Sequence, residues 1–150
     1  MNVKIESVSV KQLNELYVIE KQCFDQEAFS QRELAYLLTD YNSIGLAAKI
    51  DGEIVGFAIA RVDVQRNAPF GHILTVDVMP AYRRRGMAQK LLCEIETILR
   101  ERGVKECRLE VREDNFAALS LYRKMGYEKV GILERYYGEV DGVYLKKILR

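Results

Sequence analysis

The chain has 150 residues, of which 23 are Lys or Arg and 22 are Asp or Glu, so its formal net charge is +1. This length suits one domain with a hydrophobic core of its own, and we expect a single domain over residues 1–150. The balanced charge excludes a general attraction to nucleic acid or to an anionic membrane.

Cysteine usage and hydropathy indicate where such a chain works. Cys23, Cys93 and Cys107 are odd in number and lack Cys-x-x-Cys spacing, which argues against a disulfide framework and against zinc. The N-terminus lacks the apolar run of a signal peptide, and no segment reaches the ~18 apolar residues of a spanning helix. We expect a cytoplasmic protein with free thiols and no metal.

The N-terminal part of the chain predicts a strand and two helices. Residues 3–8 alternate as in a half-buried strand. Capping boxes follow at Ser9-Val-Lys-Gln12 and at Ser30-Gln-Arg-Glu33. The helices that they open are expected to end near Phe24 and Asp40.

Three strands are predicted next. Residues 44–50 and 54–63 are joined through Asp51-Gly52, a strong hairpin signal. Another strand is expected over residues 72–79, and it leads into the most informative segment of the chain.

This segment, residues 76–88, passes from an apolar strand through a basic turn into an amphipathic helix. Gly86 has no Cβ, so the backbone can approach an anion, and the N–H groups and dipole of a first helical turn favour negative charge. Arg83, Arg84 and Arg85 add positive charge beside it. The segment predicts a site for a small phosphate-bearing ligand.

Two helices and three strands complete the chain. One helix is expected from Gly86 to a stop at Gly103, with apolar residues at helical spacing. A second, capped by Asn115, is expected to end at Gly126. The strands are expected over residues 107–112, 127–135 and 140–149.

The predicted order β-α-α-β-β-β-α-β-α-β-β, with a basic glycine turn before the third helix, resembles the GNAT superfamily of acetyl-CoA-dependent N-acetyltransferases. The family signature, Arg or Gln followed by x-x-Gly-x-Gly or Ala, is present as Arg83-Arg84-Arg85-Gly86-Met87-Ala88, and similar segments follow at 109–115 and 118–127. The resemblance covers essentially the whole chain. It implies a single-domain α/β (α+β) fold with a mixed, mostly antiparallel sheet flanked by helices and splayed where acetyl-CoA enters.

Within the superfamily, the chain is most similar to RimI-type and Ard1-type protein Nα-acetyltransferases. The similarity lies in the strand 109–112, the helix end 121–126 and the late Arg135-Tyr136-Tyr137. The first loop departs from RimI relatives, which often carry Pro-Trp-Ser where this chain has Glu27-Ala28-Phe29-Ser30. That difference bears on the substrate more than on the chemistry.

The resemblance implies acetyl-CoA as the cofactor. It assigns the pyrophosphate to backbone N–H groups of the basic turn and the pantetheine arm to the main chain of the preceding strand. A backbone N–H near Val76 or Asp77 would polarise the thioester carbonyl. The residues implied to bind the cofactor are Val76, Asp77, Val78, Arg83, Arg84, Arg85, Gly86, Met87, Ala88, Asn115 and Tyr122.

The resemblance also assigns the chemistry. Glu110 draws the proton from the amine through water, and Tyr122 protonates the departing sulfur in one ternary complex. By residue pattern alone, Glu110 is an ordinary polar-face strand residue and Tyr122 an amphipathic core residue. Asn115 is explained by capping alone. His72, the only histidine, is interpreted as a strand-end residue and is not counted as catalytic.

An α-amine has an unperturbed pKa of ~7.7–8.0 against ~10.4 for lysine, so a carboxylate relay suits a protein N-terminus. The expected function is acetylation of the N-terminal α-amine of a ribosomal or other protein. Two alternatives stay open: acetylation of a small amine, such as a polyamine or an amino-acid derivative, and a non-catalytic acyl-CoA-binding or auxiliary module.

Substrate contacts are predicted from two segments. Phe24, Asp25 and Glu27 lie in the first loop, and Tyr136 and Tyr137 lie before the last strand. The loop residues have a structural alternative as staple and connector, and the tyrosines as sheet packing. The expected partner is a protein N-terminus or peptide, with or without an auxiliary subunit, for a monomer or homodimer that contacts neither nucleic acid nor membrane.

Overall fold

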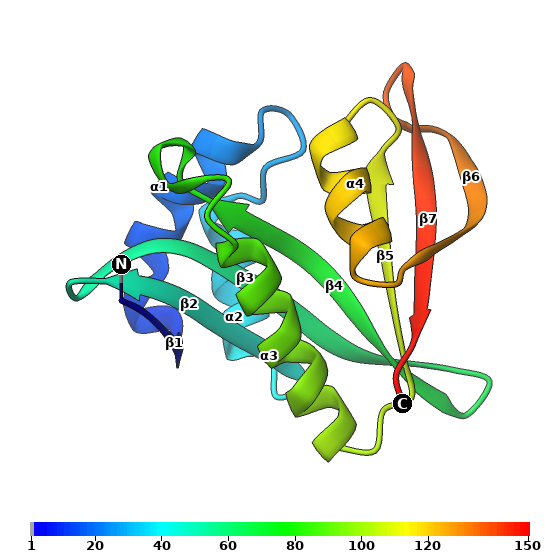
Figure 1. Ribbon diagram of the computed structural model, residues 1–150, viewed down its shortest axis with the longest axis horizontal. Helices are drawn as coiled ribbons and strands as arrows, with labels where there is room; N and C mark the ends of the chain where they lie inside the picture. Colours follow the sequence, from blue (N-terminus) through cyan, green and yellow to red (C-terminus); the bar gives the residue numbers. More distant parts are fainter. Residues whose placement is uncertain (1) are drawn as a thin grey trace.

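The computed structural model describes residues 2–150 and arranges them as a seven-stranded sheet in the order β1-β2-β3-β4-β5-β7-β6, with helices on both faces (Figure 1). All neighbouring strands pair antiparallel except β4 and β5, which are parallel. The predicted mixed, mostly antiparallel α/β fold is confirmed. The elements are β1 (Val3–Ser7), η1 (Val10–Gln12), α1 (Leu13–Cys23), α2 (Gln31–Thr39), β2 (Ser43–Ile50), β3 (Glu53–Gln65), β4 (Ala68–Val78), η2 (Pro80–Tyr82), α3 (Met87–Glu101), β5 (Glu106–Arg112), α4 (Phe116–Lys124), β6 (Glu128–Tyr137) and β7 (Val140–Ile148).

Both predicted capping boxes form. At α2 the Ser30 hydroxyl accepts the Glu33 N–H at 3.1 Å, and the Glu33 carboxylate accepts the Ser30 N–H at 3.0 Å. The box at Ser9 opens the short 3-10 turn η1, which continues into α1. These local bonds satisfy N–H groups that a helix leaves without a backbone acceptor, so they determine where η1 and α2 begin.

The β3–β4 hairpin is longer than the sequence predicts. The strands run to Gln65 and from Ala68, and Arg66 and Asn67 join them with φ of +52° and +63°. Positive φ at both central residues matches the right-handed twist of a tight hairpin. Glycine usually signals such a turn, and its absence hides this one in the sequence.

Each face of the sheet carries its own core. The buried stripe of α3, predicted from its helical spacing, packs with α4 on one face. Helices α1 and α2 cover the other face through Leu16, Ile19, Leu34 and Leu37. Within residues 2–150, no helix has the length and apolar content needed to cross a membrane.

Strands β4 and β5 separate soon after they meet. Their register contains only Gly71 with Cys107 and His72 with Arg108, although β4 continues to Val78 and β5 to Arg112 (Figure 1). A Cβ on Gly71 would lie 2.5 Å from Leu99 Cδ1, so glycine leaves room for this side chain of α3 to pack over the junction. Beyond it, one edge of β4 has no strand partner in the described part of the chain.

Candidate active site

The basic turn between β4 and α3 has the geometry of an anion site. Gly86 is the N-cap of α3 with φ of +79°, and a Cβ built on it meets no atom within 4 Å. The first helical bond runs from the Lys90 N–H to the Gly86 carbonyl at 3.1 Å. The N–H groups before Lys90 therefore have no acceptor inside the helix, and this donor set suits a phosphate.

Arg83 holds this turn against the sheet. Its Nε donates to the Val78 carbonyl at 3.0 Å, and its Nη2 lies 3.5 Å from Cys23 Sγ. Its backbone N–H donates to the Pro80 carbonyl at 3.4 Å. Two of its guanidinium nitrogens are thus directed to groups within the protein, and a cofactor contact from Arg83 stays a prediction. The Arg85 guanidinium lies 5.6 Å from the centre of the Tyr82 ring.

At the open edge of β4, the backbone N–H groups of Val76 and Val78 are available to a ligand, and that of Asp77 is not. The Met79 N–H donates to the Val55 carbonyl at 2.8 Å, and Asp77 pairs with Phe57 of β3. Residues alternate along an antiparallel ladder, so the Asp77 N–H faces β3. The expectation that this N–H polarises a thioester is corrected for that reason. The polar groups of Val76 and Val78 face the side away from β3.

The Asp77 side chain lies in a buried polar cluster under α1. Asp77 Oδ1 lies 2.5 Å from the Thr75 hydroxyl, which lies 3.0 Å from Glu20 Oε1. Glu20 Oε2 accepts the Phe29 N–H at 3.0 Å, while Asp77 Oδ2 is buried without a partner. Burial and the neighbouring Glu20 raise the pKa of Asp77 well above its ordinary value.

Glu110 lies on the part of β5 that has no β4 partner, and it is not an isolated carboxylate. Its Oε1 is 2.8 Å from Nε2 of His72, whose Nδ1 is 3.2 Å from Asp63 Oδ2. Burial alone would lower the pKa of His72, but its hydrogen bonds and charge interactions with Glu110 and Asp63 raise it overall. The structure thus pairs His72 with Glu110, the predicted base, whereas the sequence pattern indicated only a strand-end residue.

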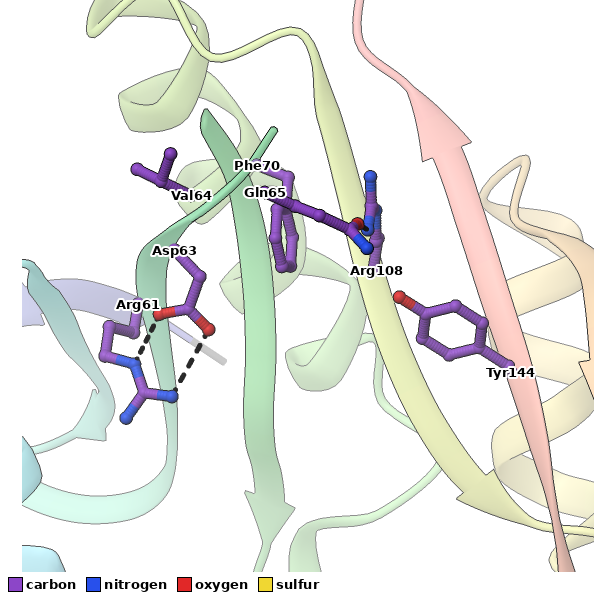
Figure 2. A pocket seen from close by; sticks show the side chains of 7 residues that line it. All are labelled: Arg61, Asp63, Val64, Gln65, Phe70, Arg108 and Tyr144. Atoms are coloured by element: carbon purple, nitrogen blue, oxygen red, sulfur yellow. Dashed lines mark hydrogen bonds and ion pairs between the residues drawn. The ribbon is translucent and has the colours of Figure 1, made fainter. Parts of the chain in front are cut away.

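Figure 2 shows how Asp63 is held in turn. Arg61 Nε donates to Asp63 Oδ1 at 2.7 Å and Nη2 donates to Oδ2 at 3.2 Å, both from β3. These two residues also line an open hollow of about 630 Å³, with Phe70, Arg108 and Tyr144 on the neighbouring strands. The four-residue chain from Arg61 through Asp63 and His72 to Glu110 crosses three strands.

Tyr122 is buried on α4, with its ring edge-on to Tyr127 at 5.6 Å between centres. Burial raises the pKa of Tyr122, with further contributions from Asp77 and Tyr137, so its hydroxyl stays protonated at neutral pH. A proton donor needs that state. Asn115 caps α4 by accepting the Ala118 N–H at 3.1 Å, as its sequence position predicts.

Predicted substrate residues meet at the far end of β5. Arg112 pairs with Glu27 from the first loop, and its guanidinium lies 5.9 Å from the centre of the Tyr137 ring. Tyr136 and Tyr137 stack edge-on at 4.9 Å between ring centres. Burial raises the pKa of both, and the charge of Glu110 contributes to the increase. Glu27, Tyr136 and Tyr137 are thus brought toward Glu110.

Phe24 and Asp25 are not drawn into this group. Phe24 is half-buried after the end of α1, and the Asp25 side chain is exposed. Arg112 was not predicted, because its role depends on a partner 85 residues away. His72 and Glu110 are 38 residues apart, and only their places on adjoining strands connect them.

Comparison with known proteins agrees with this geometry. Residues 10–127 match the Acetyltransferase (GNAT) family. An N-alpha-acetyltransferase of Sulfurisphaera tokodaii is 31% identical over 117 residues, covering 72% of this chain and 70% of that protein. The N-alpha-acetyltransferase RimI of Mycobacterium tuberculosis is 42% identical over 108 residues, covering 71% of this chain and 63% of that protein.

A solved structure shows the same arrangement of elements. The ribosomal-protein-S18-alanine N-acetyltransferase from Escherichia coli has a TM-score of 0.87 at 25% identity, covering 99% of this chain and 94% of that one. Family, relatives and fold agree. The chain therefore belongs to the GNAT family of acetyltransferases and is an acetyl-CoA-dependent N-acetyltransferase.

Proposed function

We propose that this enzyme acetylates the α-amine of a protein N-terminus by direct attack on acetyl-CoA in a ternary complex. The observation that carries the proposal is the parting of β4 and β5 after His72. The basic turn and the open edge of β4 lie on one side of this opening, and Glu110 lies on the other. An extended thioester and an amine can then meet between the strands.

The cofactor residues are proposed from the donor groups described above. The N–H groups from Arg84 to Ala88 hold the pyrophosphate, and the main chain of Val76 and the N–H group of Val78 align the pantetheine arm. Asn115 approaches the cofactor from α4 while it caps that helix. Acetyl-CoA supplies the activated carbonyl and the thiolate leaving group.

Glu110 and Tyr122 move the protons. The α-ammonium of a substrate must lose a proton before attack and a second one afterwards. Glu110, with His72 on its carboxylate, accepts a proton through water, and Tyr122 donates one to the departing sulfur. The balance of the reaction is one proton on CoA and one released to solvent. No acyl-enzyme forms.

The choice of a protein N-terminus rests on the substrate end of the site. Tyr136, Tyr137 and Glu27 lie around the Glu110 end of β5, where the first residues of a peptide would enter. The relatives are named N-alpha-acetyltransferases, and the Escherichia coli neighbour acts on an alanine of ribosomal protein S18. We propose that this enzyme also takes a peptide, with a ribosomal protein among the candidate substrates.

A peptide panel tests the substrate. Peptides with varied first residues, one of them an Ala-initiated ribosomal sequence, are offered beside spermidine and free amino acids, with CoA release as the readout. We expect turnover of peptides, and blocking their α-amine by formylation should abolish it. Exclusive turnover of the small amines would reject an N-terminal substrate.

Two variants test the proton steps. E110Q removes the basic carboxylate and Y122F removes the donor hydroxyl, so each should lower kcat by about 10²-fold or more. Affinity for acetyl-CoA, measured by calorimetry, should change little because neither change touches the pyrophosphate turn. Wild-type kcat in both variants would contradict these assignments.

A further inference from the structure

The proton acceptor of the site extends beyond Glu110. We propose that Asp63 on β3 is a positioning residue that holds the imidazole of His72, so that His72 and Glu110 together receive the substrate's proton. The inference rests on the proposed function, since it extends the acceptor assigned there to Glu110. Asp63 contacts neither substrate nor cofactor and acts only through His72.

The geometry around His72 favours an imidazole ring that carries a proton on both nitrogens. Both ring nitrogens face carboxylate oxygens, at 2.8 Å from Glu110 and 3.2 Å from Asp63. A carboxylate only accepts hydrogen bonds, so two ionised carboxylates are both satisfied when the ring carries two N–H groups. The group therefore holds a proton tightly when one is present. Without it, a lone pair of His72 faces an oxygen of Glu110.

Such a pair is a better acceptor than a lone carboxylate. A free Glu side chain titrates near ~4.3, far below the ~7.7–8.0 of an α-ammonium. A proton that reaches Glu110 can pass to Nε2, where the imidazolium is held by Asp63 on its other nitrogen. It then leaves to solvent, so each turnover restores the starting state and nothing is oxidised or reduced.

Asp63 is fixed in the orientation that this role needs. The two bonds from Arg61 leave Asp63 Oδ2 directed to His72 Nδ1 as well. The side chains are only partly exposed, at 26% for Asp63 and 21% for His72, so water screens the contact incompletely. If the Arg61–Asp63 ion pair served stability alone, Asp63 would not need to contact His72, which bonds the proton acceptor Glu110.

Other charged and titratable groups around the His72–Glu110 pair come from several strands. Arg108 pairs in register with His72, Tyr144 pairs with Glu110, and Tyr136 and Tyr137 interact electrostatically with Glu110. On the α2 side, Asp40 and Tyr36 act on Arg61 rather than on His72. Among residues 2–150, Asp63 is the only one that places an anion on the second nitrogen of the ring.

The test uses D63N, which keeps the shape and an acceptor oxygen but removes the charge. The chain has one histidine, so an untagged protein gives a single imidazole signal by NMR whose pH titration reports His72 directly. Loss of the anion destabilises the protonated form of the imidazole, so the midpoint of the His72 titration should fall by about one pH unit. The acid limb of kcat/KM should move to lower pH by the same amount, and kcat should fall about tenfold on the plateau. KM for acetyl-CoA should not change.

Matched variants separate this role from a structural one. D51N makes the same change in the exposed β2–β3 turn, where Asp51 has φ of +51° and Asn is well tolerated, and should leave both titrations unchanged. D63E retains the charge, and its midpoint should lie between wild type and D63N, which guards against a D63N protein that folds poorly.

An unchanged His72 midpoint in D63N would overturn the proposal. So would a shifted midpoint with an acid limb that stays in place, because the proton on His72 would then be irrelevant to turnover. If wild-type protein acetylates no peptide, the proposed function fails, and the NMR titration still decides whether Asp63 controls the proton on His72.

Discussion

At the scale of single residues, Thr75 offers one hydroxyl proton to two buried carboxyl groups, those of Glu20 and Asp77. The hydrogen bonds close if Asp77 is protonated and donates to Thr75, which then donates to Glu20. The raised pKa of Asp77 agrees with this order. Sequence alone pointed to Asp77 only as a backbone contact, because its burial under α1 is a tertiary fact.

D77N should therefore stabilise the protein near neutral pH. An Asn amide donates to Thr75 as a protonated Asp does, without a proton to take up. Since the folded-state pKa is raised, wild type is most favoured below about pH 4 and loses stability as pH rises toward that folded pKa. We expect D77N to gain about 1–2 kcal/mol in unfolding free energy by urea denaturation at neutral pH, and no gain below about pH 4.

The control for this prediction is an exposed Asp to Asn change, D51N, which should be neutral at both pH values. A loss of stability in D77N at neutral pH would mean that Asp77 is ionised in the folded protein and that its charge is stabilised there.

At the scale of elements, helix α3 begins and ends at glycines of nearly the same conformation. Gly86 has φ of +79° and Gly103 has φ of +77°, and a Cβ on either meets no atom within 4 Å. The two positions share their backbone strain but not their surroundings. Only Gly86 lies at the N-terminus, where the N–H groups and the dipole favour an anion.

G86A and G103A should separate binding from stability. Each should cost about 1 kcal/mol of unfolding free energy, because alanine disfavours positive φ. Only G86A should weaken the binding of acetyl-CoA, by about tenfold, since its methyl group would stand where we propose that the pyrophosphate approaches the backbone. Calorimetry and thermal melts measure the two effects. Equal affinity for acetyl-CoA in the two variants would contradict an anion site at this turn.

At the scale of the whole molecule, the sheet is two parts that meet at one narrow junction. The pairs Gly71 with Cys107 and His72 with Arg108 form the whole parallel register between β1–β4 and β5–β7. A cofactor that lies along β4 in the opening would add contacts to both parts. It would then act as a link between them as well as a reactant.

Hydrogen exchange should show this link. Saturating acetyl-CoA should slow exchange at the Val76 and Val78 amides, and it should leave the Asp77 amide, already directed to β3, far less affected. At a hundredfold excess over Kd, the cofactor should add about 2.7 kcal/mol to stability. Amides of the exposed β2–β3 turn, such as Gly52, serve as the internal control because they exchange without global unfolding. Unaltered exchange at both valines would contradict the proposed pantetheine path.

The sequence determined those features that depend on neighbours along the chain. The capping boxes, the buried stripe of α3 and the Asn115 cap involve residues within a few positions of one another, so their pattern is visible directly. The order of elements and the basic glycine turn were also enough to indicate the family. Glu110 and Tyr122 were named as catalytic through that resemblance, and their roles stay predictions.

Only the tertiary structure decided which distant residues act together. It placed His72 on Glu110, Asp63 on His72 and Arg112 on Glu27, and it turned the Asp77 side chain away from the cofactor edge. These contacts follow from strand register and from the place where β4 and β5 separate. Register is set by the packing of the whole sheet, and a single residue type at a single position carries no signal of it.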